Sequence, residues 1–214
     1  MPDISWLEVA VVAKRKHKGT MRRSDIPYAK RLQMDQIATI SAVREHSAQI
    51  TLFCLSVALN RLYGKGYKSL VRYSLVFKQH IDEFYDNYEV SLDRCRRRLA
   101  SHGITIKDGF PVVSAPGMNP RDKQQYDNAI HASYVAHIVG LIAVNETFKK
   151  GKEPMERISV LAAELMEQYN KEGAGFLFDE MQRIGFPIIN GKVTACLDDD
   201  NNPISYKKYL EGQG

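Results

Sequence analysis

The residues with the clearest capacity for chemistry in this sequence are the arginines of the segment 90–102. Arg94, Arg97 and Arg98 are spaced at i, i+3 and i+4, which places them on one face if the segment is helical. The apolar residues of the segment share the opposite face, and they are Leu92, Cys95 and Leu99. Guanidinium groups bind phosphate oxygens in pairs of hydrogen bonds. The pattern therefore predicts a helix that is anchored to a core and contacts phosphate through its three arginines.

A second basic cluster lies near the start of the chain. The stretch 14–31 carries eight basic residues against one acidic residue, a net charge of +7 in a protein whose total is +5. The stretch 90–102 carries four arginines against one aspartate, so the rest of the chain has a net charge of −5. The first cluster is expected to add contacts that are independent of nucleotide sequence and weakened by salt. The residues predicted to make them are Lys14, Arg15, Lys16, Lys18, Arg22 and Arg23.

Motifs for catalysis and phosphate binding are not found in the sequence. No GxSxG, HExxH or GxGxxG is present. The segment 64–69, GKGYKS, has the composition of a phosphate-binding loop, but its spacing is wrong and a helix is expected before it, so we interpret it as a turn between helices. The acidic segment 198–202 lacks the glycine and the glutamate that a calcium loop needs at its sixth and twelfth positions, and it is interpreted as a solvated turn.

Histidines and cysteines give no metal-ligand pattern. His131 and His137 are six residues apart, so on one helix they point in different directions. A neutral, hydrogen-bonded core histidine is the simpler interpretation of His137, and a catalytic base beside Tyr134 is the alternative. The cysteines are widely separated and form no CxxC pair, so we expect reduced thiols and no disulfide, metal or cofactor. They are Cys54, Cys95 and Cys196.

Two uncharged stretches predict the centre of the fold. The segment 130–144 contains no Asp, Glu, Lys or Arg, which is typical of a helix buried all round. It is too short to cross a bilayer. Small residues recur through it at spacings of three and four, forming a ridge that another helix backbone could approach closely: Ala129, Ala132, Ala136, Gly140 and Ala143. The uncharged segment 47–59 is the expected partner.

The remaining periodicity predicts a mainly α protein. About six helices are expected to pack around the two buried central helices, with a small C-terminal β-hairpin or three-stranded sheet around the turn Asn190-Gly191. We expect a basic N-terminal arm or edge strand at 1–30, a helical core domain at 31–185 and a small β appendage at 186–214. No internal repeat is evident in the sequence, and no secretory signal or membrane span is found, so a cytoplasmic location is expected.

The segregated charge supports one leading hypothesis and leaves others open. The leading one is a non-enzymatic protein that binds nucleic acid or another polyanion through the two basic clusters. A protein-interaction module, such as an adaptor or inhibitor of a larger complex or a homodimer, is the alternative, favoured by the eleven tyrosines and the small-residue ridge. A small-molecule enzyme ranks last. In the simplest interpretation, both basic clusters are solvated surface paired with the acidic remainder of the chain.

Overall fold

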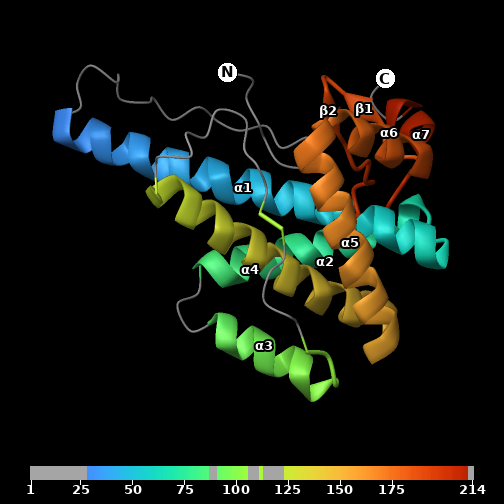
Figure 1. Cartoon of the computed structure of the whole chain (residues 1–214). Coiled ribbons are helices and arrows are strands. Elements are labelled where there is room, and N and C mark those ends of the chain that lie inside the picture. The colour runs from blue at the N-terminus through green and yellow to red at the C-terminus, as the bar shows by residue number, and fades with distance from the viewer. Residues whose placement is uncertain (1–27, 87–90, 106–110, 113–122, 212–214) are drawn as a thin grey trace.

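The computed structural model describes residues 28–86, 91–105, 111–112 and 123–211, with side chains from residue 38 in the first helix and from residue 127 in the fourth. This part of the chain forms seven helices and one two-stranded antiparallel sheet, which confirms the mainly α prediction (Figure 1). The elements are α1 (Tyr28–Tyr63), α2 (Tyr67–Asp86), α3 (Leu92–Ser101), α4 (Lys123–Phe148), α5 (Lys152–Glu172), α6 (Gly175–Ile184), β1 (Ile188–Ile189), β2 (Lys192–Val193) and α7 (Tyr206–Glu211).

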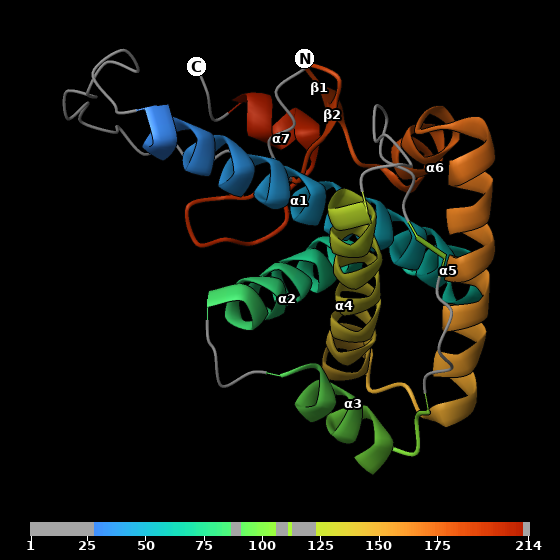
Figure 2. The same cartoon turned by 60° about the vertical axis from the view of Figure 1, so that its left-hand side comes forward.

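The two predicted central helices are the uncharged parts of α1 and α4, and each packs most extensively against the other (Figure 2). The small-residue ridge of α4 is buried, and at Gly140 the backbone lies directly against Leu55 of α1. A Cβ atom at Gly140 would overlap Leu55 Cδ1 and would lie 3.2 Å from Phe77 Cε2. The absence of a side chain at Gly140 therefore lets α1 and α4 pack closely, as the small-residue ridge predicts.

The other helices cover this central pair. α2 packs mainly on α4, and α5 packs mainly on α1. α3 lies on α4, and α6 lies on α1. The apolar side of α2 is buried through Leu70, Tyr73, Phe77 and Ile81. All three cysteines are buried free thiols.

The C-terminal β element is a minimal hairpin. Ile188 pairs with Val193 and Ile189 with Lys192, around a two-residue turn in which Asn190 and Gly191 both have positive φ. The predicted turn is confirmed, and the second strand ends at Val193. The last described segment forms α7. Of the predicted N-terminal arm or edge strand at 1–30, residues 1–27 lie outside the described residues and residues 28–30 belong to α1.

The two long helical hairpins have the same local structure, which the sequence analysis did not detect. Residues of α1 and α2 correspond to residues of α4 and α5 with a constant difference of 85 in residue number. Asn60 Nδ2 donates to the Lys65 carbonyl (3.0 Å), and Asn145 Nδ2 donates to the Lys150 carbonyl (2.8 Å). The first residue after each helix has positive φ, which is 61° at Gly64 after α1 and 51° at Lys149 after α4.

The correspondence continues into the third helix of each half, where the difference in residue number is 82. α3 and α6 are each followed within two residues by a glycine with positive φ, Gly103 after α3 and Gly185 after α6. In both cases the backbone N–H of the residue after the glycine donates a hydrogen bond of 3.0 Å to a carbonyl in the last turns of the helix. Ile104 donates to Leu99, and Phe186 donates to Met181. The order helix, helix, short helix therefore occurs twice in the described chain.

Contacts between the halves are reciprocal. The rings of His46 on α1 and Tyr169 on α5 are tilted against each other, with centroids 6.2 Å apart. The equivalent residues, His131 on α4 and Phe84 on α2, have ring centroids 6.4 Å apart. Such an exchange of equivalent contacts is what a two-fold axis produces.

Ion pairs follow the same exchange with their charges reversed. Arg98 on α3 pairs with Glu146 on α4, and Glu180 on α6 pairs with Arg61 on α1 at 3.2 Å. Position 61 corresponds to 146, and position 98 corresponds to 180. The first half therefore supplies both arginines, and the second half supplies both glutamates. The two halves are therefore related by an approximate two-fold axis that runs between α1 and α4.

Candidate polyanion-binding surface

The short helix α3 presents the predicted arginines, and its sequence explains its position. Ser91 caps the helix, because its Oγ accepts a hydrogen bond from the Arg94 backbone N–H at 3.2 Å. Cys95 and Leu99 are buried against the core. All four arginines of the helix are exposed. The predicted division into an apolar inner face and a basic outer face is confirmed by this burial.

Two of the four arginines are held by α4. Arg96 Nε and Nη2 donate to the Tyr134 hydroxyl at 3.1 and 2.5 Å, and the guanidinium lies 5.0 Å from the centre of the Tyr134 ring. Arg98 forms an ion pair with Glu146. These contacts fix α3 on α4 through its basic side chains as well as through its apolar face.

The predicted three-arginine face is therefore divided by the structure. Arg98 faces the Glu146 carboxylate, whereas Arg94 and Arg97 extend from the exposed side of the helix, with Arg97 Nε donating to the Asp93 carbonyl at 3.4 Å. Phosphate contact by these three arginines stays a prediction. The basic residues Lys14 to Arg23 lie outside the described residues, so their predicted role is also untested.

A polar network beneath α3 joins three helices, and the sequence analysis missed it. Glu146 accepts from Arg98 and also meets His80 Nε2 at 2.6 Å, while His80 Nδ1 lies 3.3 Å from Glu83 Oε2. The pKa of the Glu83 carboxyl is lowered, first by a hydrogen bond from Gln79 and then by His80. His80 and Glu146 are 66 residues apart, and only the pairing of α2 with α4 brings them together.

His137 belongs to the core. Its side chain is 1% exposed, and its Nε2 lies 2.9 Å from the Ser159 hydroxyl on α5. Burial lowers the pKa of His137 to about 3, so the ring is neutral near pH 7. Tyr134 instead contacts Arg96 on α3. The two side chains therefore point to different neighbours, which favours the core interpretation of His137 over a shared catalytic pocket.

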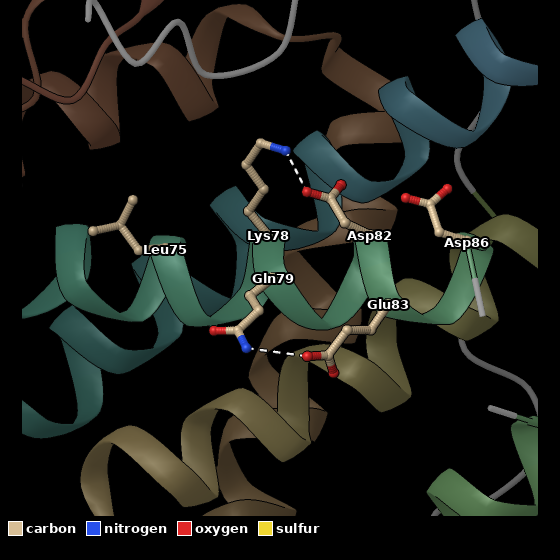
Figure 3. A pocket seen from close by; sticks show the side chains of 6 residues that line it. All are labelled: Leu75, Lys78, Gln79, Asp82, Glu83 and Asp86. Atoms are coloured by element: carbon tan, nitrogen blue, oxygen red, sulfur yellow. Dashed lines mark hydrogen bonds and ion pairs between the residues drawn. The ribbon is translucent and has the colours of Figure 1, made fainter. Parts of the chain in front are cut away.

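A depression of about 530 Å³ runs along the outer side of α2. Figure 3 shows that its polar side chains diverge: Lys78 and Asp82 extend to one side of the helix, whereas Gln79 and Glu83 extend to the other. They also pair with each other along the helix, at 2.5 Å for Lys78 Nζ and Asp82 and at 3.0 Å for Gln79 and Glu83. No polar group in this depression is directed at a common point where a ligand would bind.

A second depression, of about 340 Å³, lies between α1 and α2. The Arg44 guanidinium lies 4.5 Å from the centre of the Tyr85 ring there, and Lys78 and Asp82 also line the depression. Charges of both signs alternate across this depression, so it has no preference for a ligand of one charge.

Metal binding and membrane insertion find no support in the described residues. No group of three or more His, Cys, Asp or Glu side chains there could hold a metal ion. None of the helices in the same part of the chain combines the length and the apolar character that a membrane crossing requires.

Searches against protein-family models, curated proteins and solved structures gave no match to this chain. The exposed arginines of α3 are the feature of the described residues that most favours a particular kind of ligand.

Proposed function

We propose that this protein binds nucleic acid or another polyanion through the exposed side of α3 and the basic segment 14–23. The observation that carries the proposal is a short basic helix that is anchored on its apolar face and exposes Arg94 and Arg97. Arginine is well suited to phosphate because its planar guanidinium offers paired donors. An anchored helix also holds these donors in place before binding, which lowers the entropy that binding costs.

The neighbouring contacts refine the roles within the arginine cluster. Arg96 and Arg98 hold α3 on α4, and Arg98 shares Glu146 with His80. Arg94 and Arg97 are the arginines whose side chains we expect to contact phosphate directly. Arg98 contributes positive charge at the edge of this surface, partly offset by the Glu146 carboxylate.

A salt titration tests the proposal. Fluorescence anisotropy would measure binding of a mixed pool of DNA and RNA to the wild type and to R94E/R97E between low and physiological salt. The logarithm of the association constant falls with the logarithm of salt concentration, with a slope near −0.7 to −0.9 for each phosphate contact. We expect R94E/R97E to weaken binding at least about tenfold and to make the slope shallower by about two contacts.

The matched control is K207E/K208E, which makes the same change of charge on α7. Both lysines are exposed, and α7 lies at the opposite end of the molecule from α3 (Figures 1 and 2). Arg98 is left unchanged because its replacement would also break the ion pair with Glu146. An equal loss of affinity in both variants would show a general effect of net charge and would reject α3 as the site.

The N-terminal segment is tested separately. Replacing all six of its basic residues by glutamine removes their charge without adding acidic groups. We expect a weaker, shallower salt dependence and no change in the contribution of Arg94 and Arg97, because the two clusters act on different phosphates. Wild-type protein that fails to bind any polyanion at low salt would contradict the proposed function as a whole.

The alternative of a protein-interaction module has lost one of its two supports. The small-residue ridge is covered inside the molecule, where Gly140 faces Leu55. Among the residues whose side chains the structure describes, the large apolar ones that remain exposed lie on three different helices, and they are Ile130, Val160, Tyr206 and Leu210. Binding to a protein partner through such side chains would change little with salt, which separates this alternative from polyanion binding.

A further inference from the structure

The turn between α1 and α2 and the turn between α4 and α5 lie against each other. The ammonium group of Lys65 lies 5.0 Å from the centre of the Phe148 ring, and that of Lys150 lies 4.0 Å from the centre of the Tyr63 ring. Each lysine thus rests on the aromatic residue that ends the first helix of the other half. The contact is reciprocal, so the approximate two-fold axis emerges from the molecule between these two turns. We refer to residues 64–66 and 149–151 as the lysine turns.

The surface around the lysine turns is basic. Lys68, Lys149 and Lys152 are exposed there beside the two stacked lysines. Two of the nearby carboxylates, Glu146 and Glu180, are engaged by Arg98 and Arg61. Their negative charge is therefore already balanced. Glu153 in the first turn of α5 is a further exposed carboxylate on this surface, but the five lysines outnumber it.

This surface adjoins α3. Glu146, the partner of Arg98, lies two residues before Phe148, which carries the Lys65 ammonium on its ring. Figure 2 shows α3 beside the connection from α4 to α5. The lysine turns therefore lie near the end of α3 that carries Arg98.

The stacking holds the two equivalent ammonium groups in place. An ammonium over an aromatic face is attracted by the electron-rich face of the ring, which is the negative part of its quadrupole. Lys65 and Lys150 are partly buried, so their apolar stems are packed while each carries a positive charge at the surface. Binding a ligand to both lysines would therefore cost less side-chain entropy than binding it to two freely rotating lysines.

The symmetry of this arrangement selects a kind of polyanion. Two-fold symmetric proteins bind duplex DNA with their axis aligned on the two-fold symmetry that relates its strands. A single strand has no such axis. Resting on the function proposed above, we propose that the lysine turns contact phosphates on both strands of a nucleic-acid duplex, with Lys65 facing one strand and Lys150 the other.

The experiment compares a mixed-sequence 20-base-pair DNA duplex with one of its single strands at equal length. The test variant is K65M/K150M, because methionine keeps an unbranched apolar stem on each ring and removes only the charge. K207M/K208M on α7 is the matched control. We expect wild type to prefer the duplex at least about tenfold, and K65M/K150M to lose most of that preference with a salt slope shallower by about two contacts.

The outcomes separate this inference from the proposed function. Equal wild-type affinity for duplex and single strand, or duplex binding by K65M/K150M that matches the control, would overturn the role of the lysine turns and leave polyanion binding standing. Wild-type protein that binds neither probe at low salt would overturn both. Melting temperatures establish that the variants are folded, and if K65M/K150M is not, the exposed pair K149Q/K152Q is held to the same two criteria.

Discussion

Leu55 and Gly140 are equivalent residues of the two halves and they meet each other where α1 and α4 pack. A side chain at Gly140 would overlap Leu55 Cδ1, so one half supplies a large residue and the other supplies none. At a true two-fold axis both positions would carry the same residue. Two leucines would collide there and two glycines would leave a void, so the difference between the halves allows the central helices to pack closely.

The first prediction concerns this contact. Gly140→Ala should lower the free energy of unfolding by about 1–3 kcal/mol, because the new methyl group has to displace Leu55 or Phe77. Gly175→Ala is the control, since a Cβ there meets no atom within 4 Å. Urea unfolding measures both changes.

A double-mutant cycle tests the pairing of Leu55 with Gly140 directly. Leu55→Ala alone should cost about 2–5 kcal/mol through the cavity it leaves. The double variant L55A/G140A should be less destabilised than the sum of the single variants by about 1 kcal/mol or more, because the added methyl group enters the space that the leucine vacates. Strict additivity would show that the two side chains do not compete for this space.

The packing of the central helices could be predicted from the sequence, but the repeat could not. Uncharged stretches and the small-residue ridge identify buried helices because burial excludes charge whatever the tertiary contacts are. Equivalent residues of the halves share burial and role more than identity, as Leu55 with Gly140 and Phe84 with Tyr169 illustrate. The ion pairs even exchange their charges, so a comparison of residue types detects no relation between Arg98 and Glu180.

The candidate site was predictable in part for the same reason. Helical spacing shows which arginines share a face with each other, and the apolar residues between them show which face is buried. It does not show what lies across from that face. Tyr134 and Glu146 are 38 and 48 residues from the arginines they bind, and only the docking of α3 on α4 assigns Arg96 and Arg98 to them.

The second prediction tests the equivalence of the two turns. Asn60→Ala and Asn145→Ala each remove a side-chain hydrogen bond to a turn carbonyl. We expect each to lower the free energy of unfolding by about 0.5–1.5 kcal/mol, because both bonds close the same turn. Gln182→Ala, at an exposed position of α6, is the control. A cost at one turn and none at the other in urea unfolding would show that the two turns are not energetically equivalent.

The third prediction assigns Arg96 a different role from Arg97. Arg96→Ala removes the contacts with Tyr134 and should speed amide hydrogen exchange throughout α3, because this arginine holds the helix on α4. Arg97→Ala should leave exchange unchanged and weaken polyanion binding. Tyr134→Phe, which keeps the ring and removes only the hydroxyl, should give part of the effect of Arg96→Ala. Faster exchange in Arg97→Ala than in Arg96→Ala would reverse these roles.

The last prediction concerns the buried histidine. Burial lowers the pKa of His137 to about 3, whereas an exposed histidine in the unfolded chain has its ordinary pKa near 6.5. Between these values the unfolded chain binds a proton that the folded chain does not, so stability falls as pH falls through this range. His137 alone should lower the free energy of unfolding by about 1.4 kcal/mol per pH unit between about pH 6 and 4. Partial desolvation also lowers the pKa values of His46 and His131, so these two histidines add to the same trend.

His137→Leu removes the largest part of this dependence. Leucine is the residue at the equivalent position of the first half, Leu52, where it is buried in the core, so the replacement suits an apolar site. Urea unfolding at pH 7, 6, 5 and 4.5 should show a clearly shallower slope for His137→Leu than for the wild type. His102→Leu, at an exposed position, should keep the wild-type slope. Parallel slopes for His137→Leu and the wild type would mean that the folded protein admits a proton to His137, and that the core around Ser159 opens to water in acid.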